Sequence, residues 1–232
     1  MARSPLEPTF DALPRIIPIF PLTGVLLLPG GHLPLNIFEP RYLAMIRAAL
    51  AEDARLIGMV QPRVPDPDDN RGASESFTRG EKPETYQTGC AGRITDFSET
   101  PDGRYTLTLS GLCRFSIVEE LEEQDGYRRV LADYSRYRGD LGDQLEPDID
   151  RERLLAAMRG YFDLQDVKLD WDAVEKTPVD RLVTSLAMTC PFGPNERQAL
   201  LEASGAGARA GIIVTLLEMA LAETGGASGS SH

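Results

Sequence analysis

Proline residues interrupt the first two apolar runs of this chain and limit how those runs can fold. The run Ile16-Ile17-Pro18-Ile19-Phe20-Pro21-Leu22 is followed by Leu28-Pro29-Gly30-Gly31 and then by Pro34-Leu35-Asn36-Ile37-Phe38-Glu39-Pro40-Arg41-Tyr42. Proline has no N–H for a ladder hydrogen bond, so within sheets it is confined to edges, first positions and bulges. Its fixed φ angle suits the first turn of a helix. The segment therefore predicts two short strands that lead into a helix beginning at Glu39-Pro40.

Further apolar runs separated by turn residues predict that the N-terminal part is rich in β-structure. Tyr105, Leu107 and Leu109 alternate with threonines, which indicates a strand with one buried face. Pro101-Asp102-Gly103 and Ser110-Gly111 have turn chemistry and predict connections between strands. The predicted strands cover residues 56–60, 86–97, 105–109, 113–120 and 127–137, and residues 62–83 predict a long mobile loop.

The pattern changes to helical spacing after residues 138–147, which are rich in Gly, Asp and Pro. Leu154, Leu155, Met158, Tyr161 and Phe162 form one apolar stripe, and later segments show similar spacing. Strands followed by helices predict an α+β fold. We expect a flexible lead over 1–14, a β-subdomain over 15–138 with one helix at about 39–51, a helical bundle over 139–223 and a disordered tail over 224–232.

Charge and composition exclude several classes of function. The formal net charge is −12, and such a chain is repelled by nucleic acid. No apolar stretch approaches the ~20 residues of a membrane helix, and no secretory signal is evident, so we expect a cytoplasmic protein that binds no membrane. Cys90, Cys113 and Cys190 form no C-x-x-C pair, and His32 is the only histidine before the tail, so neither a disulfide framework nor a metal site is predicted.

Several segments together resemble the N-terminal substrate-binding domain of Lon proteases. These are the proline-interrupted start, Thr88-Gly89-Cys90-Ala91-Gly92-Arg93-Ile94, Asp102-Gly103-Arg104, Leu109-Ser110-Gly111-Leu112-Cys113-Arg114-Phe115 and Ala187-Met188-Thr189-Cys190-Pro191-Phe192, and the resemblance spans residues 15–222. It implies a small PUA-like β-barrel followed by a helical bundle, and it implies binding of unfolded or flexible polypeptide segments. The rest of Lon has no counterpart in the sequence, so we expect a stand-alone member of the family, with full-length Lon as a further candidate partner.

No catalytic residue is predicted. The sequence lacks the G-x-x-x-x-G-K-[ST] phosphate loop of an ATPase, and none of Lys82, Lys168 and Lys176 lies in an apolar setting that would activate a serine. Cys190 has no evident base beside it, and a buried structural cysteine is the commoner outcome. We therefore expect a protein that uses no cofactor and is not an enzyme.

The leading hypothesis is a non-catalytic module that binds exposed apolar segments as an adaptor or a weak chaperone-like protein. A peptide would add a strand to an open barrel edge or occupy a groove between barrel and bundle. The alternative is a small-molecule-binding PUA-like module, because barrels of this kind elsewhere recognise RNA or compact ligands and the charge opposes RNA. The residues expected to line the peptide site are Leu28, Pro29, Leu33, Phe38, Tyr42 and Phe192.

Four charged residues are candidates for either structural or ligand contacts. Glu39 is expected to accept hydrogen bonds from N–H groups at the helix start, and Arg41 is expected to pair with a nearby carboxylate. Direct contact with a ligand is the alternative for both. Arg93 and Arg114 are expected to form salt bridges within the barrel or to hold a peptide carboxylate.

Overall fold

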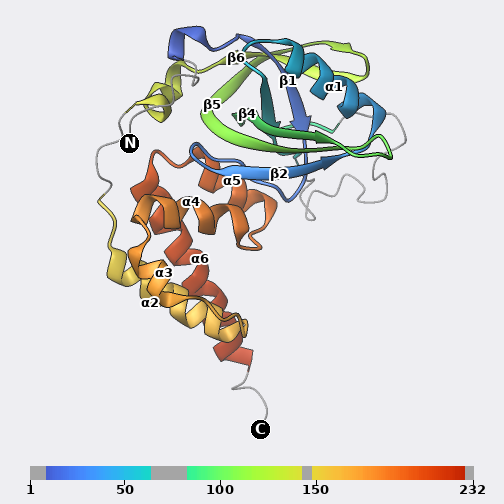
Figure 1. The fold of residues 1–232 in the computed structure, drawn as a ribbon. Helices are drawn as coiled ribbons and strands as arrows, with labels where there is room; N and C mark the ends of the chain where they lie inside the picture. Colours follow the sequence, from blue (N-terminus) through green and yellow to red (C-terminus); the bar gives the residue numbers. More distant parts are fainter. Residues whose placement is uncertain (1–8, 64–82, 143–147, 228–232) are drawn as a thin grey trace, which may run out of the picture.

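Strands occupy the first part of the fold and helices occupy the second, which confirms the predicted α+β class (Figure 1). The computed structural model describes residues 9–63, 83–142 and 148–227. The strands are β1 (Ile16–Pro21), β2 (His32–Ile37), β3 (Leu56–Val60), β4 (Thr88–Glu99), β5 (Tyr105–Gln124) and β6 (Tyr127–Asp133). The helices are η1 (Phe10–Ala12), α1 (Pro40–Ala51), η2 (Ser135–Leu141), α2 (Arg151–Leu164), α3 (Trp171–Lys176), α4 (Val179–Thr189), α5 (Pro194–Glu202) and α6 (Ala206–Ala227).

Hydrogen-bonded pairings close five of the described strands into a ring. β1 pairs with β3 and β6, β4 pairs with β3 and β5, and the pairing of β5 with β6 completes the circuit. β2 lies outside the ring and pairs with the first half of β5, with Leu33 opposite Leu109. A closed ring satisfies the backbone groups that an open sheet would leave at its edges.

The prolines of β1 occupy positions that need a partner strand on one side only. Pro18 pairs with Arg129 of β6, and Pro21 pairs with Val60 of β3. Ile19 is the residue of β1 at which both registers overlap, opposite Gly58 and Arg128. β1 therefore passes from one neighbour to the other along its length, and this arrangement tolerates the missing N–H groups.

The predicted turn at Ser110-Gly111 is wrong, because both residues lie inside the 20-residue strand β5. The pairing of β5 with β4 shifts register here, with Gly111 opposite Gly92. The Gly111 N–H donates to the Gly31 carbonyl at 2.9 Å, and the Gly111 carbonyl accepts from Gly30 N–H at 2.9 Å. Gly111 thus lets a loop pack directly against the strand backbone.

Several described elements cross the predicted boundaries. The helical turn η1 and the buried residue Leu13 lie within residues 1–14, the predicted lead. Tyr137 and Leu141 of η2 pack in the same core as Phe115, so the β-part continues past residue 138. The backbone of α6 continues to Ala227, into the predicted tail. Residues 1–8, 64–82, 143–147 and 228–232 lie outside the described residues, including most of the predicted loop and tail.

Two hydrophobic cores hold the fold together. The smaller core fills the ring and contains Ile17, Ile19, Val60, Phe115 and Val130. The larger core lies outside the ring and joins α1, the loop 26–28 and the helical bundle. Figure 1 shows α2–α6 gathered on the β2 side of the sheet, with α4 and α5 nearest to it.

We predict that Gly111→Ala destabilises the fold by roughly 2–3 kcal/mol, because the added methyl group would overlap the Leu28 carbonyl oxygen and neither backbone can move freely. Gly139→Ala is the matched control, since the space around Gly139 is open. Urea unfolding of both variants measures the difference. Equal free energies of unfolding for the two variants would contradict the packing argument.

Candidate functional site

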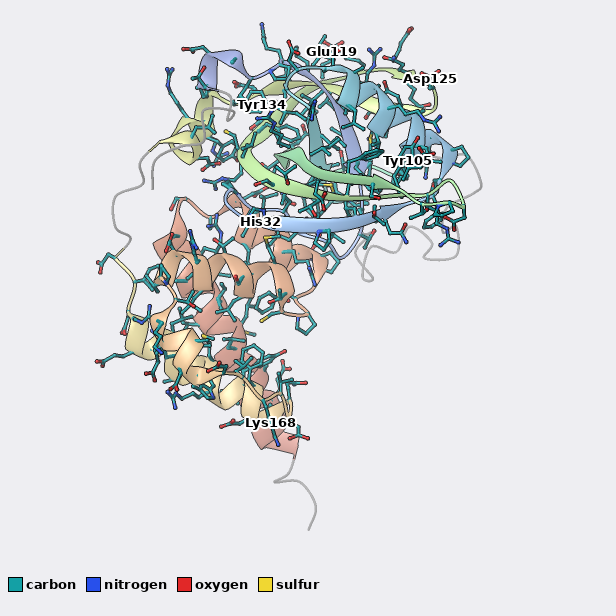
Figure 2. All side chains as sticks on the ribbon, in the orientation of Figure 1. His32, Tyr105, Glu119, Asp125, Tyr134 and Lys168 are labelled. Carbon is teal, nitrogen blue, oxygen red and sulfur yellow. The ribbon has the colours of Figure 1, made fainter. Side chains whose placement is uncertain are left out.

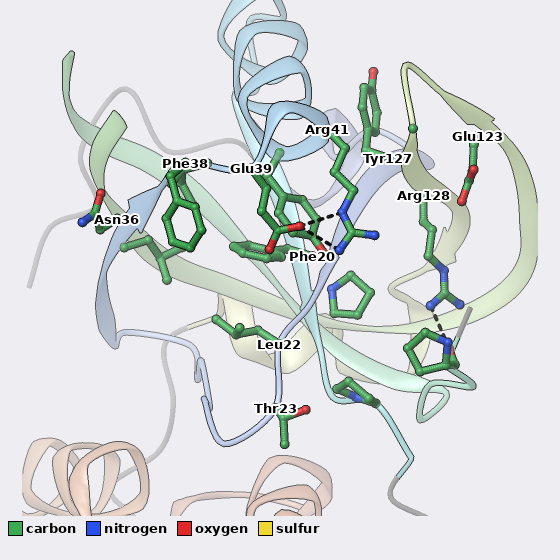
Figure 3. A pocket seen from close by; sticks show the side chains of 17 residues that line it. Phe20, Leu22, Thr23, Asn36, Phe38, Glu39, Arg41, Glu123, Tyr127 and Arg128 are labelled. Atoms are coloured by element: carbon green, nitrogen blue, oxygen red, sulfur yellow. Dashed lines mark hydrogen bonds and ion pairs between the residues drawn. The ribbon is translucent and has the colours of Figure 1, made fainter. Parts of the chain in front are cut away.

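A cleft of about 640 Å³ opens beside the start of α1. Its walls come from the end of β1, the end of β2, the first turn of α1 and the turn between β5 and β6 (Figure 3). Gly126 in that turn comes close to Arg41, because a Cβ atom at Gly126 would lie 3.4 Å from the Arg41 Cβ atom. The lining residues are Phe20, Pro21, Leu22, Thr23, Leu35, Asn36, Ile37, Phe38, Glu39, Arg41, Tyr42, Pro62, Pro83, Glu123, Gly126, Tyr127 and Arg128.

Aromatic side chains form the apolar part of the cleft. The ring centroids of Phe20 and Tyr42 lie 4.2 Å apart, and both residues are buried. Phe38 is different, because 63% of it is exposed to solvent although it is a large apolar residue. Burial raises the pKa of the Tyr42 and Tyr127 hydroxyls, so both keep their protons at neutral pH. The cleft thus combines a buried aromatic floor with an exposed aromatic residue at its rim.

Two arginines of the cleft are held by carboxylates. Glu39 accepts hydrogen bonds from Arg41 at 2.9 Å and 3.0 Å, and the Arg41 guanidinium lies 4.6 Å from the centre of the Tyr42 ring. Arg128 donates two hydrogen bonds of 2.7 Å to the Glu120 carboxylate and one of 2.9 Å to the Pro83 carbonyl. These contacts fix both guanidinium groups at the rim.

The prediction that the Glu39 side chain satisfies N–H groups at the helix start is wrong. Glu39 is the N-cap residue of α1, but its side chain accepts no capping hydrogen bond; its backbone carbonyl accepts from Tyr42 and Leu43. Pro40 at the first helical position removes one N–H that would have needed a partner. The Glu39 carboxylate is therefore available for the pair with Arg41, and the prediction that Arg41 pairs with a carboxylate is confirmed.

The structure brings together only some of the residues predicted to bind a peptide. Phe38 and Tyr42 line the cleft, as do the polar candidates Glu39 and Arg41. Leu28 is fully buried and cannot contact a ligand without a change in packing. The residues that lie outside the cleft lining are Leu28, Pro29, Leu33 and Phe192, of which Leu33 and Phe192 pack against the larger core.

Sequence reasoning missed Phe20, Leu22 and Arg128 as parts of this cleft. Phe20 lies in an apolar run that is equally typical of a strand in the core, so its sequence gives no sign of a cleft. Arg128 is one of many arginines, and nothing in its neighbours marks it as part of a site. The Asp125-Gly126 pair was a usable signal for the turn that brings Arg128 near α1, since Asp-Gly is a strong hairpin signature. Gly126 has a φ of 80° and Asp125 one of 49°, which is the left-handed region that such turns require.

Arg114 is almost fully buried and makes its contacts within the protein. It forms an ion pair of 2.7 Å with Asp140, and the two side chains are only 7% and 4% exposed. Its guanidinium also donates to the carbonyls of Leu201 and Ala203 at the end of α5. Of the two contacts expected for Arg114, the structure contains the salt bridge, and the contacts with the two carbonyls join strand β5 to the helical bundle. Arg93 is half-buried on β4, opposite Leu56 of β3, and does not line the cleft.

Nothing among the described residues favours the enzyme hypothesis. Burial raises the pKa of the Cys190 thiol to about 11, so the nucleophilic thiolate is scarce at neutral pH. His32 is exposed on β2. Across the described ranges, no three His, Cys, Asp or Glu side chains are grouped to hold a metal ion.

No helix in these ranges has the length and apolar character to cross a membrane.

Comparison with known proteins defines the class of this domain. Residues 16–219 match the family model described as "ATP-dependent protease La (LON) substrate-binding domain". This match covers most of the chain, so the chain belongs to the LON substrate-binding domain family, and the resemblance recognised in the sequence is confirmed. The description of this family names substrate binding.

Related sequences and solved structures agree with this assignment. The chain is 31% identical over 113 residues to Lon protease 2 of Myxococcus xanthus and 21% identical over 214 residues to Lon protease of Bacillus thuringiensis. These matches cover 49% and 88% of the chain but only 12% and 24% of the relatives.

The fold is similar to a Lon N-terminal domain protein from Xanthomonas campestris, with a TM-score of 0.56 and 21% identity. This similarity covers 89% of this chain and 97% of that one. It is also similar to the N-terminal domain of a Mycobacterium avium complex Lon protease, with a TM-score of 0.54, 16% identity and coverage of 88% and 98%.

We predict that Asp140→Ala destabilises the protein by about 3–5 kcal/mol, because it leaves the Arg114 guanidinium buried without its counter-ion. Glu218→Ala is the control, since it removes a carboxylate that pairs with Arg153 on the exposed surface. Chemical unfolding should show a large loss for the first variant and little change for the second. A small loss for Asp140→Ala would show that the pair does not hold the barrel and the bundle together.

Proposed function

We propose that this domain binds exposed apolar segments of unfolded or flexible polypeptides in the cleft beside α1. The domain would act as an adaptor or a chaperone-like binder and would carry out no reaction of its own. The family assignment supports substrate binding in general, and the Lon relatives make a Lon protease a candidate partner.

The observation that carries this proposal is the position of Phe38. A large aromatic side chain that is mostly exposed loses hydrophobic stabilisation in the free protein, and exposed apolar patches commonly mark interaction sites. Phe38 lines the same cleft as the buried residues Phe20 and Tyr42, and Figure 3 shows the Phe38 and Phe20 side chains. The volume of about 640 Å³ is enough for one or two large side chains of an extended segment.

The rim supplies polar groups for the backbone of such a segment. Asn36 is exposed at the end of β2 and can donate to or accept from a peptide group. Arg41 has further N–H groups beyond those used by Glu39, and a guanidinium carries five donors. A bound segment would bury an apolar side chain in the cleft, and its backbone would form hydrogen bonds with the rim. Because the backbone is the same in every sequence, this mode of binding suits extended segments of many different sequences.

A compact small molecule is the second candidate ligand. The cleft volume falls within the range of small-molecule sites, and its lining mixes aromatic groups with two glutamates and two arginines. A metabolite that binds in the cleft should raise the unfolding temperature and should also displace unfolded polypeptide. A metabolite that raises the unfolding temperature without displacing the polypeptide must bind at a second site.

We predict that Phe38→Ala weakens the binding of reduced, carbamidomethylated lactalbumin roughly tenfold, because it removes about 1–2 kcal/mol of apolar contact. The fold should be unaffected, since Phe38 makes its contacts at the surface. Fluorescence anisotropy with a labelled polypeptide measures the affinity.

Val118→Ala provides the matched control for this experiment. Val118 is 59% exposed on β5 and is not part of the cleft lining, so its loss should leave the affinity unchanged. Equal affinities for the wild-type protein and both variants would rule out the cleft as the binding site. Equal losses in the two variants would indicate non-specific apolar binding.

A further inference from the structure

The end of β5 and the turn that follows it, residues 119–126, are strongly acidic and are called the acidic turn below. Between Val118 and Arg129 the chain carries five carboxylates and only two guanidiniums, which leaves three negative charges. Glu123 and Gly126 of this segment line the cleft directly. Figure 2 shows Glu119 and Asp125 at the end of the sheet that is remote from Lys168 in the helical bundle. The carboxylates are those of Glu119, Glu120, Glu122, Glu123 and Asp125, and all five residues are exposed.

Among the described residues, the cations near the cleft each lie beside a carboxylate and leave this negative sum unchanged. Arg41 is paired with Glu39 and Arg128 with Glu120, so each guanidinium is matched by a carboxylate. Arg63, next to the lining residue Pro62, lies 3.9 Å from the Glu84 carboxylate. The whole chain has a formal net charge of −12, so its long-range field has the same sign as the acidic turn.

From this charge distribution we infer that the cleft prefers apolar segments flanked by lysine or arginine. The apolar residue occupies the aromatic floor, and the flanking cations lie against the acidic turn of β5 and β6. The carboxylates are not a binding site by themselves; they select the charge of a segment that the cleft holds. This inference rests on the proposed function and specifies its substrate class.

The magnitude of the preference follows from the exposure of the charges. Exposed ion pairs contribute little each, so two or three of them together give roughly a tenfold difference in affinity at low salt. Salt screens such pairs, and the Debye length falls to about 8 Å at physiological ionic strength. The preference should therefore shrink as salt is added, whereas the apolar contact with Phe38 should not.

The test uses two peptides that share the centre Leu-Phe-Leu-Phe and differ only in flanking Lys or Glu residues. We expect the Lys-flanked peptide to bind the wild-type protein roughly tenfold more tightly at 20 mM salt, with a smaller difference at 300 mM salt. The variant E119Q/E122Q/E123Q should lose most of this preference. The control variant E152Q/D163N/E223Q removes three exposed carboxylates from the helical bundle and should retain it.

Two outcomes would overturn the inference while the proposed function stands. One is equal binding of the two peptides by the wild-type protein, with Phe38→Ala weakening both. The other is an equal loss of preference in the two triple variants, which would assign the effect to net charge and not to the acidic turn. If neither peptide binds and unfolded lactalbumin also fails to bind, the proposed function itself is wrong.

Discussion

The long strand β5, which pairs with three other strands, is the constraint on which the other features of this domain depend. Its 20 residues form hydrogen-bonded ladders with β2, β4 and β6, and the last of these pairings closes the ring. The close approach of the loop 28–31 at Gly111 is possible because this position carries no side chain. The same strand carries Arg114 toward the helical bundle and ends in the turn that forms one wall of the cleft.

Buried charge and exposed apolar surface have opposite roles in this molecule. The Arg114–Asp140 pair is removed from water and also binds carbonyl groups of α5, so it orients the bundle on the barrel. Phe38 is left in water although it gives no stability there. Stability thus resides in the two cores and the interface between barrel and bundle, which leaves the rim of the cleft available for binding.

Local patterns predicted the class of the fold but not the long-range contacts. The helix at 39–51 and the alternation in Tyr105, Leu107 and Leu109 were visible because capping chemistry and strand periodicity are local signals. Ser110-Gly111 was misread because glycine at a close backbone approach and glycine in a turn look the same in sequence. At the site, Phe38, Glu39, Arg41 and Tyr42 were predicted together from one contiguous motif.

The remaining cleft residues come from segments distant in sequence, and no local pattern indicates which of them meet. Phe20 and Arg128 are brought together by the pairing of β1 with β6, which depends on the closure of the ring. Leu28 and Phe192 were expected at the site because they are apolar, yet apolar residues are more often core than surface. The structure places Leu28 in the core and packs Phe192 against it.

Hydrogen exchange of the whole chain, with and without unfolded lactalbumin, tests most directly whether the cleft is the binding site. Binding in the cleft predicts slower exchange in residues 20–23, 35–42 and 123–128, with no change in α2 and α6. Protection confined to the helical bundle, or to the segments between the bundle and β2, would contradict this account and would place the binding site elsewhere.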